Sequence, residues 1–190
     1  MRTATIERKT KETDIALTLC LDGGEVSVDT GVGFFDHMLT AFTTHEGFGL
    51  QVSCKGDLEV DCHHTVEDIG IVLGQALFEC LGDKSNLVRY GSFFVPMDEA
   101  LGFCAVDICN RAYTVFEAEF PQEKCGDFDA CMCVEFFRAV ADNAKITLHL
   151  RAPYGDNSHH IAEAIFKAFG HAMSIATEKT DKTLSTKGTL

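Results

Sequence analysis

The sequence predicts an α+β fold with internally duplicated half-units, each a mostly antiparallel sheet packed against helices. The main observation is a repeat, because His63-His64-Thr65-Val66-Glu67 returns 96 residues later as His159-His160-Ile161-Ala162-Glu163. Apolar residues alternate as in strands before each copy and recur at helical spacing after it. Since the offset is about half of the 190 residues, an internal duplication explains both the motif and the architecture.

Composition and charge narrow the class of protein. With 46% hydrophobic residues, the chain can bury a full core without disulfides or a structural metal. A formal net charge of -13 argues against nucleic acid and membrane surfaces as partners. The sequence has no apolar run of about 18 residues and no signal-peptide core. Its nine cysteines, an odd number, are expected to be free thiols in a reducing compartment, so we expect a cytoplasmic protein.

The first quarter of the chain predicts an antiparallel ribbon. Residues 3–9 have the pattern of a short strand, and alternating apolar side chains at 15–21 predict a second strand. The Asp-Gly-Gly stretch at 22–24 favours a tight turn, after which residues 26–28 would return beside the second strand. We therefore expect the second and third strands to pair directly.

Two helices separated by another hairpin are expected to complete the first half. Apolar positions within 34–42 fit the buried stripe of a helix, and His37 lies outside that stripe. Residues 50–54 and 58–62 predict a hairpin that leads directly to His63 and His64. The histidine pair would then stand where a strand gives way to a helix that ends at Gly82.

The second half repeats this order loosely. Strands are predicted at 101–109, 113–120 and 145–150, and a helix is predicted at 134–140. A turn at 154–157 precedes the helix that His159 and His160 begin. Residues 177–190 have no periodicity, and by composition alone they would be a frayed end.

The repeated motif has the residue types and spacing of a metal site. On a helix, Glu67 lies three residues after His64 and four after His63, so the three side chains share one face. Two imidazoles and a carboxylate are suitable ligands for Mn, Fe, Co or Zn. A single copy would more often be solvated or cap the helix. Two copies at equivalent points of duplicated halves favour a site.

Each half offers one further ligand from its first helix. His37 lies 26 residues before His63, and Glu135 lies 24 residues before His159. Alone, Glu135 would be interpreted as an ordinary surface glutamate. The pooled set is sufficient for two metal ions with open positions for a substrate, and it comprises His37, His63, His64, Glu67, Glu135, His159, His160 and Glu163.

Other charged residues are ambiguous on spacing alone. Basic side chains at 89, 111, 167 and 187 would ordinarily be solvated, and Glu12 could be a plain surface acid. Asp98 and Glu99 follow a hydrophobic run, where they could cap the next element or act as an acid or base.

Five stretches of the sequence closely resemble the imidazoleglycerol-phosphate dehydratase family of histidine biosynthesis. They are Thr-Gly-Val-Gly-Phe-Phe-Asp-His at 30–37, His-His-Thr-Val-Glu-Asp at 63–68, Arg-Tyr-Gly at 89–91 with Pro-Met-Asp-Glu-Ala-Leu at 96–101, His-His-Ile-Ala-Glu-Ala at 159–164, and Ser-Thr-Lys-Gly at 185–188. They occur in the family's order and cover essentially the whole chain. The resemblance implies a lyase that dehydrates D-erythro-imidazole-glycerol phosphate to imidazole-acetol phosphate.

The resemblance also implies the organisation of the protein. We expect a single dehydratase domain over residues 1–190, made of two similar halves at about 1–90 and 91–190, without a fused phosphatase domain. The active sites would be shared between subunits of a 24-subunit shell. Each site would hold two manganese ions, and the family's ligands carry over to seven members of the pooled set. Glu135 is the eighth position, where many relatives have histidine, and a carboxylate there can still bind manganese.

Substrate-binding and catalytic roles follow from the same resemblance. The phosphate site carries over to Arg89, Arg111, Lys167, Ser185 and Lys187, which makes the apparently frayed tail an expected lid or anchor. Glu12, His37 and His45 would contact the substrate. Further departures from the family pattern are Cys62, Asn110, Ala112 and His171, where aspartate, glycine, proline and arginine are common.

The reaction must remove a carbon-bound proton of low acidity, which a metal pair assists as Lewis acid and template. A carboxylate must carry protons, and the candidates are Glu163, Glu67, Glu12 and Asp98. Two other classes remain open. A dinuclear metallohydrolase could use the same ligands to make a hydroxide nucleophile, and a metal-storage assembly could use them without any turnover.

Overall fold

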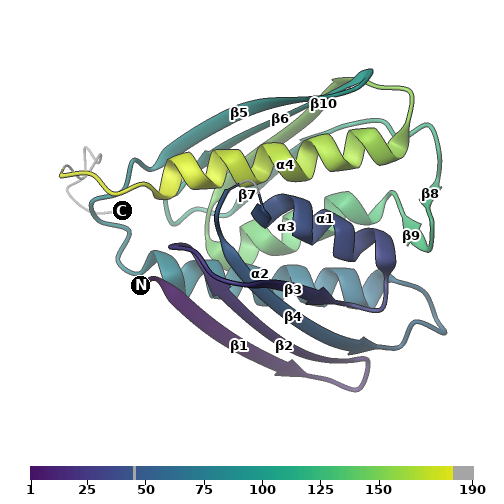
Figure 1. Cartoon of the computed structure of the whole chain (residues 1–190), viewed down its shortest axis with the longest axis horizontal. Helices are drawn as coiled ribbons and strands as arrows, with labels where there is room; N and C mark the ends of the chain where they lie inside the picture. The colour runs from purple at the N-terminus through teal and green to yellow at the C-terminus, as the bar shows by residue number, and fades with distance from the viewer. Residues whose placement is uncertain (45, 182–190) are drawn as a thin grey trace.

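The computed structural model describes residues 1–44 and 46–181 of the 190. In this part of the chain, four α-helices and two four-stranded sheets form an α+β architecture, as predicted (Figure 1). The two sheets lie on the outside, and the helices fill the space between them. Among the described helices, none combines the length and apolar character needed to cross a bilayer.

The first sheet contains β1 (Thr3–Lys9), β2 (Thr13–Cys20), β3 (Val26–Asp29) and β4 (Gly49–Gly56) in the order β1-β2-β4-β3. The β1–β2 and β2–β4 pairs are antiparallel, whereas β3 and β4 are parallel. The predicted pairing of the second and third strands is therefore wrong, because β4 lies between them. A helix joins β3 to β4, and such a crossover is the connection that parallel strands require.

A second error concerns residues 58–62, which form a turn rather than a strand. The Val60 N–H donates to the Asp57 carbonyl at 2.9 Å, and the Leu58 and Val60 side chains are exposed. Apolar alternation normally indicates a strand because one face is buried. Here Leu58 and Val60 are exposed and Cys62 alone of the three is buried, so the segment has no continuous buried face to pack as a strand.

The second sheet contains β5 (Tyr90–Met97), β6 (Ala100–Asp107), β7 (Tyr113–Glu117) and β10 (Thr147–Tyr154) in the order β5-β6-β10-β7. Its order and strand directions match those of the first sheet, since β7 and β10 are the parallel pair. The sequence pattern does not predict β5. Its adjacent residues Phe93 and Phe94 are both apolar, which interrupts the alternation, and both side chains are exposed. A short hairpin of β8 (Lys124–Cys125) and β9 (Phe128–Asp129) is also unpredicted.

The predicted helices are confirmed as α1 (Gly33–Thr44), α2 (His63–Leu81), α3 (Met132–Ala144) and α4 (Ser158–Thr177). Helix α2 packs on β1, β2 and α3, while α4 packs on β5, β6 and α1. Phenylalanines dominate the interior between them, and those under 2% exposed include Phe35, Phe42, Phe136, Phe137, Phe166 and Phe169. The two long helices are thus held by one continuous core.

Both motif-bearing helices begin at the same end of the molecule, where the β8–β9 hairpin also lies (Figure 1). The chain around the hairpin contacts both helix starts. The Cys62 Sγ lies 3.8 Å from an Asp129 carboxylate oxygen, and the Ser158 hydroxyl donates to the Gln122 carbonyl at 2.9 Å. The fold therefore brings the two histidine pairs to one end of the chain.

Close packing of α4 on β6 leads to a stability prediction. A Cβ at Gly102 would lie 2.4 and 2.5 Å from the carbonyl carbon and oxygen of Ala164. Because neither backbone can move cheaply, we expect Gly102→Ala to lower the free energy of unfolding by about 3 kcal/mol, measured by urea denaturation. Gly33→Ala is the control, since no atom lies within 4 Å of its added Cβ. Equal midpoints for the two variants would contradict the close approach.

Candidate functional site

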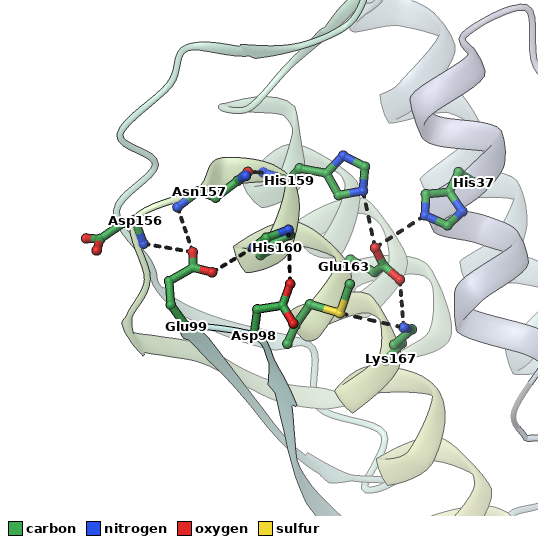
Figure 2. A network of polar contacts seen from close by, with 10 residues as sticks. His37, Asp98, Glu99, Asp156, Asn157, His159, His160, Glu163 and Lys167 are labelled. Carbon is green, nitrogen blue, oxygen red and sulfur yellow. Dashed lines mark hydrogen bonds and ion pairs between the residues drawn. The ribbon is translucent and has the colours of Figure 1, made fainter.

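The first turns of α4 present the second histidine motif. The Asn157 side chain caps the helix by accepting from the His159 N–H at 2.9 Å. Four residues apart on one face, His159 Nε2 and Glu163 Oε2 lie 3.2 Å apart. His37 of α1 brings its Nε2 to 3.3 Å from the same oxygen (Figure 2). One ligand atom from each of the three residues lies within 4.8 Å of the others, a spacing that suits a single ion.

Glu163 is the centre of this group and is nearly buried. Burial raises the pKa of the Glu163 carboxyl. The hydrogen bond and charge of Lys167, together with those of His37, lower this pKa by more than burial raises it, so the net pKa is below the ordinary value. Lys167 Nζ donates to Glu163 Oε1 at 2.6 Å, one turn along the helix. Glu163 is therefore a carboxylate at neutral pH, and its Oε2 is shared by the two imidazoles.

His160 is oriented by the turn between β5 and β6. Its Nδ1 lies 2.7 Å from Glu99 Oε2, and the other Glu99 oxygen accepts from the backbone N–H groups of Asp156 and Asn157 (Figure 2). The hydrogen bond with His160, assisted by the backbone N–H groups, lowers the pKa of Glu99 to about 2. The same hydrogen bond raises the pKa of His160. Because Glu99 can only accept, Nδ1 is the donor, and Nε2 is left facing Asp98 at 3.7 Å.

The α2 motif repeats this arrangement. His63 Nε2 lies 3.5 Å from Glu67 Oε2, and His64 Nδ1 lies 3.0 Å from Asp57, whose hydrogen bond raises the pKa of His64. The remaining nitrogen of His64 faces Glu12 at 3.9 Å. Glu12 stands in the β1–β2 turn, and Asp98 stands in the equivalent β5–β6 turn. In each half, the second histidine of the motif therefore has one acidic side chain near each of its two ring nitrogens.

Sequence reasoning misses Asp57 and Asp107, and it leaves Glu99 undecided between a cap and an acid or base. Asp57 and Glu99 hold the Nδ1 atoms of His64 and His160, and such outer partners set the tautomer and direction of ligating histidines. Asp107 at the end of β6 holds the arginines described below. The only sequence signal was the position of Glu99 next to Asp98.

Not all of the predicted metal ligands come together in one chain. Glu135 lies on α3 and pairs with Arg138 at 2.9 Å. Among the described residues, His37, His159 and Glu163 form the one group of three such side chains whose ligand atoms all lie within 4.8 Å of one another. Within residues 1–44 and 46–181, His63 and Glu67 therefore have no third such ligand atom equally close, although they lie at the same end of the fold.

The predicted phosphate-binding arginines meet at a different place. Arg89 donates through Nε and Nη2 to the two Asp107 oxygens at 2.6 and 3.1 Å, and Arg111 Nη2 lies 3.8 Å from the same carboxylate. The Arg89 N–H donates to the Ala176 carbonyl, which places this group near the C-terminus of α4. Lys167, in contrast, lies beside Glu163. The predicted His45, Ser185 and Lys187 lie outside the described residues.

The donor set of the α4 group fits a divalent ion. Two imidazole nitrogens and an ionised carboxylate converge, and oxygen and nitrogen ligands without thiolates suit Mn or Fe as well as Zn. Glu163 also keeps Lys167 at its second oxygen, as expected of a ligand with an outer partner.

Comparison with known proteins gives one consistent family. A family model described as imidazoleglycerol-phosphate dehydratase matches residues 30–173. The enzymes of that name from Acetivibrio thermocellus and Bacillus cytotoxicus are both 57% identical to the chain, covering 97% and 100% of each sequence, respectively. A crystal structure of the Staphylococcus aureus enzyme has a TM-score of 0.86 at 44% identity, over 94% of this chain and 99% of that one. The Pyrococcus furiosus structure also scores 0.86, at 37% identity, over 97% and 100%.

The Nδ1 contacts lead to a prediction about histidine titration. Replacing Glu99 by glutamine removes the charge that favours the imidazolium, so Glu99→Gln should lower the pKa of His160. Asp57→Asn should do the same for His64. The measurement is an NMR pH titration of metal-free protein with labelled histidine. Glu79→Gln, which removes an exposed acid elsewhere on α2, should leave both titrations unchanged, and an unshifted His160 in Glu99→Gln would contradict the contact.

Proposed function

Because the chain belongs to the imidazoleglycerol-phosphate dehydratase family, we propose that it converts D-erythro-imidazole-glycerol phosphate to imidazole-acetol phosphate at a dinuclear metal site. Family membership makes the protein a hydro-lyase of histidine biosynthesis. The observation that supports the metal site best is the convergence of His37 and His159 on Glu163. Each half of the fold carries such a motif, which suggests two ions.

We propose two manganese ions for each active site. Their ligands would be drawn from the eight residues His37, His63, His64, Glu67, Glu135, His159, His160 and Glu163. His64 and His160 would bind through Nε2, since their Nδ1 atoms are held by Asp57 and Glu99. Glu135 would have to leave Arg138 to take part. When bound, the ions would supply Lewis-acid assistance and a template for the imidazole ring.

The protein's own carboxylates would move the protons. Dehydration takes a proton from carbon and a hydroxyl from its neighbour, and the resulting enol becomes the ketone. The candidates are Glu163, Glu67, Glu12 and Asp98. Glu163 already contacts two imidazoles and Lys167, which favours a role as a metal ligand over a role in proton transfer. Glu12 and Asp98 are more exposed, at side-chain values of 53% and 77%, and face His64 and His160, so they are better placed to exchange protons with water.

The basic residues would hold the substrate phosphate. We assign this role to Arg89, Arg111, Lys167, Ser185 and Lys187, while Glu12, His37 and His45 would contact the rest of the substrate. Charge-assisted hydrogen bonds from such a cluster can bind an anion locally in spite of the net charge of -13. The cluster would also fix the reacting carbon relative to the ions.

The positions of these groups support a site shared between chains. Lys167 and Ala176 are nine residues apart on α4, which is about 14 Å at about 1.5 Å per helical residue. Lys167 turns back toward Glu163, whereas the arginine pair lies near Ala176, so within one chain the two groups point to different places and would not hold the same phosphate. We therefore propose that neighbouring chains complete each site, in a homo-oligomer of 24 subunits. We place it in the cytoplasm, in keeping with nine free cysteines.

The reaction can be tested by metal removal. Chelated protein should not turn over imidazole-glycerol phosphate, and added manganese should restore a ketone product that is measured directly. Inorganic phosphate is measured in the same samples. The dehydratase releases none, whereas a metallohydrolase would release it and a storage protein would form neither product. Absence of a manganese-dependent ketone would overturn the proposed function.

The shared site can be tested by mixing two inactive variants. His64→Ala and His160→Ala should each reduce kcat by more than the roughly 10–100-fold typical of losing an outer-shell partner. If a site takes His64 from one chain and His160 from another, dissociating and reassembling the two variants together should restore part of the activity.

The control for this experiment is His149→Ala, which removes an exposed histidine of β10 and should retain wild-type activity. Circular dichroism should show that each variant folds. No recovery in the mixed sample, with subunit exchange demonstrated by differently tagged chains, would place both histidines in a site within one chain.

A further inference from the structure

Lys84 is a buried lysine at the end of the fold away from the histidine motifs. It follows α2, and its residue surface is only 1% exposed. The ammonium nitrogen lies 4.8 Å from the centre of the Phe78 ring, and no carboxylate of the described residues forms an ion pair with it. Burial lowers the pKa of Lys84 to about 8, so the charged form still predominates at pH 7. Such a charge is costly to bury, which calls for a reason.

The hydrogen bonds of Lys84 join two other parts of the chain. Its Nζ donates to Asn110 Oδ1 at 2.5 Å and to the Ala144 carbonyl at 3.3 Å. Ala144 is the last residue of α3, so the ammonium caps a helix C-terminus, where a positive charge is favourable. Asn110 belongs to residues 108–112, which connect β6 to β7. Lys84 therefore ties this connection to the end of a rigid helix.

Asn110 has a backbone conformation that needs support. Its φ is +59°, in the left-handed region, which asparagine tolerates better than most residues. The next residue is Arg111, whose carbonyl accepts from the Thr147 hydroxyl at 3.0 Å. The side chain of Asn110 and the carbonyl of Arg111 are both hydrogen-bonded, so the backbone here is fixed. From this position the Arg111 guanidinium reaches Asp107.

Lys84 is also close in sequence to the second arginine. Arg89 lies five residues later, and its guanidinium meets the same Asp107 carboxylate. The segment that begins at Lys84 and the connection that contains Asn110 thus carry the two members of the arginine pair. Movement between these two segments would separate the guanidinium groups.

We propose that Lys84 is a positioning residue for phosphate binding: through Asn110 it holds residues 108–112 so that Arg111 lies beside Asp107 and Arg89. The inference rests on the proposed role of Arg111 in binding the substrate phosphate. Lys84 itself is buried and does not touch the substrate. Its effect should therefore appear in substrate and phosphate affinity rather than in the chemical step.

The experiment compares variants of the full-length, manganese-loaded protein. In Lys84→Met the ammonium is replaced by an apolar group of similar length. We expect KM to rise, and the affinity for inorganic phosphate to fall, by about tenfold, as for loss of one hydrogen bond from a charged group, with kcat within about twofold of wild type. Phosphate affinity is measured by calorimetry, and folding by thermal unfolding.

Variants of Asn110 separate positioning from general stability. Asn110→Gly keeps the positive φ accessible while removing the acceptor, so it should raise KM as Lys84→Met does. The double variant should be no worse than the poorer single variant, because both changes remove one contact. Asn110→Asp keeps an oxygen acceptor for Lys84, so this single variant should retain a KM close to that of the wild type. If Lys84→Met does not fold, the two Asn110 variants still decide the question.

Lys179→Met is the matched control, because it removes an exposed lysine near the Leu87 segment and should leave KM unchanged. Arg111→Ala tests the underlying assignment. If Arg111→Ala leaves KM unchanged, the proposed phosphate site and this inference both fail. If Arg111→Ala raises KM while folded Lys84→Met and Asn110→Gly do not, the phosphate site stands and the inference about Lys84 is overturned.

Discussion

The buried carboxylate of Glu163 is the interaction on which the α4 site depends. A carboxylate removed from water needs partners, and Glu163 has three, contributed by His37, His159 and Lys167. His159 and Lys167 come from its own helix at spacings of four residues, but His37 comes from α1. The site therefore exists only if α1 packs on α4. Stacked Phe42 and Phe169, with ring centroids 5.0 Å apart, make that contact in the core.

The two halves of the fold repeat the surroundings of the histidines more faithfully than they repeat every predicted metal ligand. Asp57 and Glu99 hold equivalent ring nitrogens, although they come from different loops. The first helices of the two halves differ, since α1 provides His37 to Glu163 whereas α3 provides Glu135, which pairs with Arg138. A carboxylate in place of an imidazole adds negative charge. The two half-sites should therefore differ in charge even where their geometry is the same.

Sequence patterns predicted what is local in this fold. Helical spacing predicted all four helices and placed the first histidine of each pair on the same face as its glutamate, because residues four apart are neighbours on a helix. The second histidine of each pair instead contacts acids from other segments. The position of β3 beside β4 depends on a crossover, and β5 lacks the alternation that marks a strand. Contacts such as Glu99 with His160 and Arg89 with Asp107 join residues 61 and 18 positions apart. No periodicity signals such contacts, so only packing reveals them.

The Asp107 carboxylate gives the two arginines unequal roles. Arg89 makes two short hydrogen bonds to it, whereas the exposed Arg111 lies 3.8 Å away. In the proposed phosphate site, the anion would compete with Asp107 for these guanidinium groups, and the exposed Arg111 would leave Asp107 at lower cost than Arg89. Arg89 and Asp107 would then stay paired, while the Arg111 side chain would turn toward the anion. Since such a side chain is useful only if its backbone stays in place, the connection at 108–112 must be rigid, and a buried lysine under Asn110 provides that rigidity.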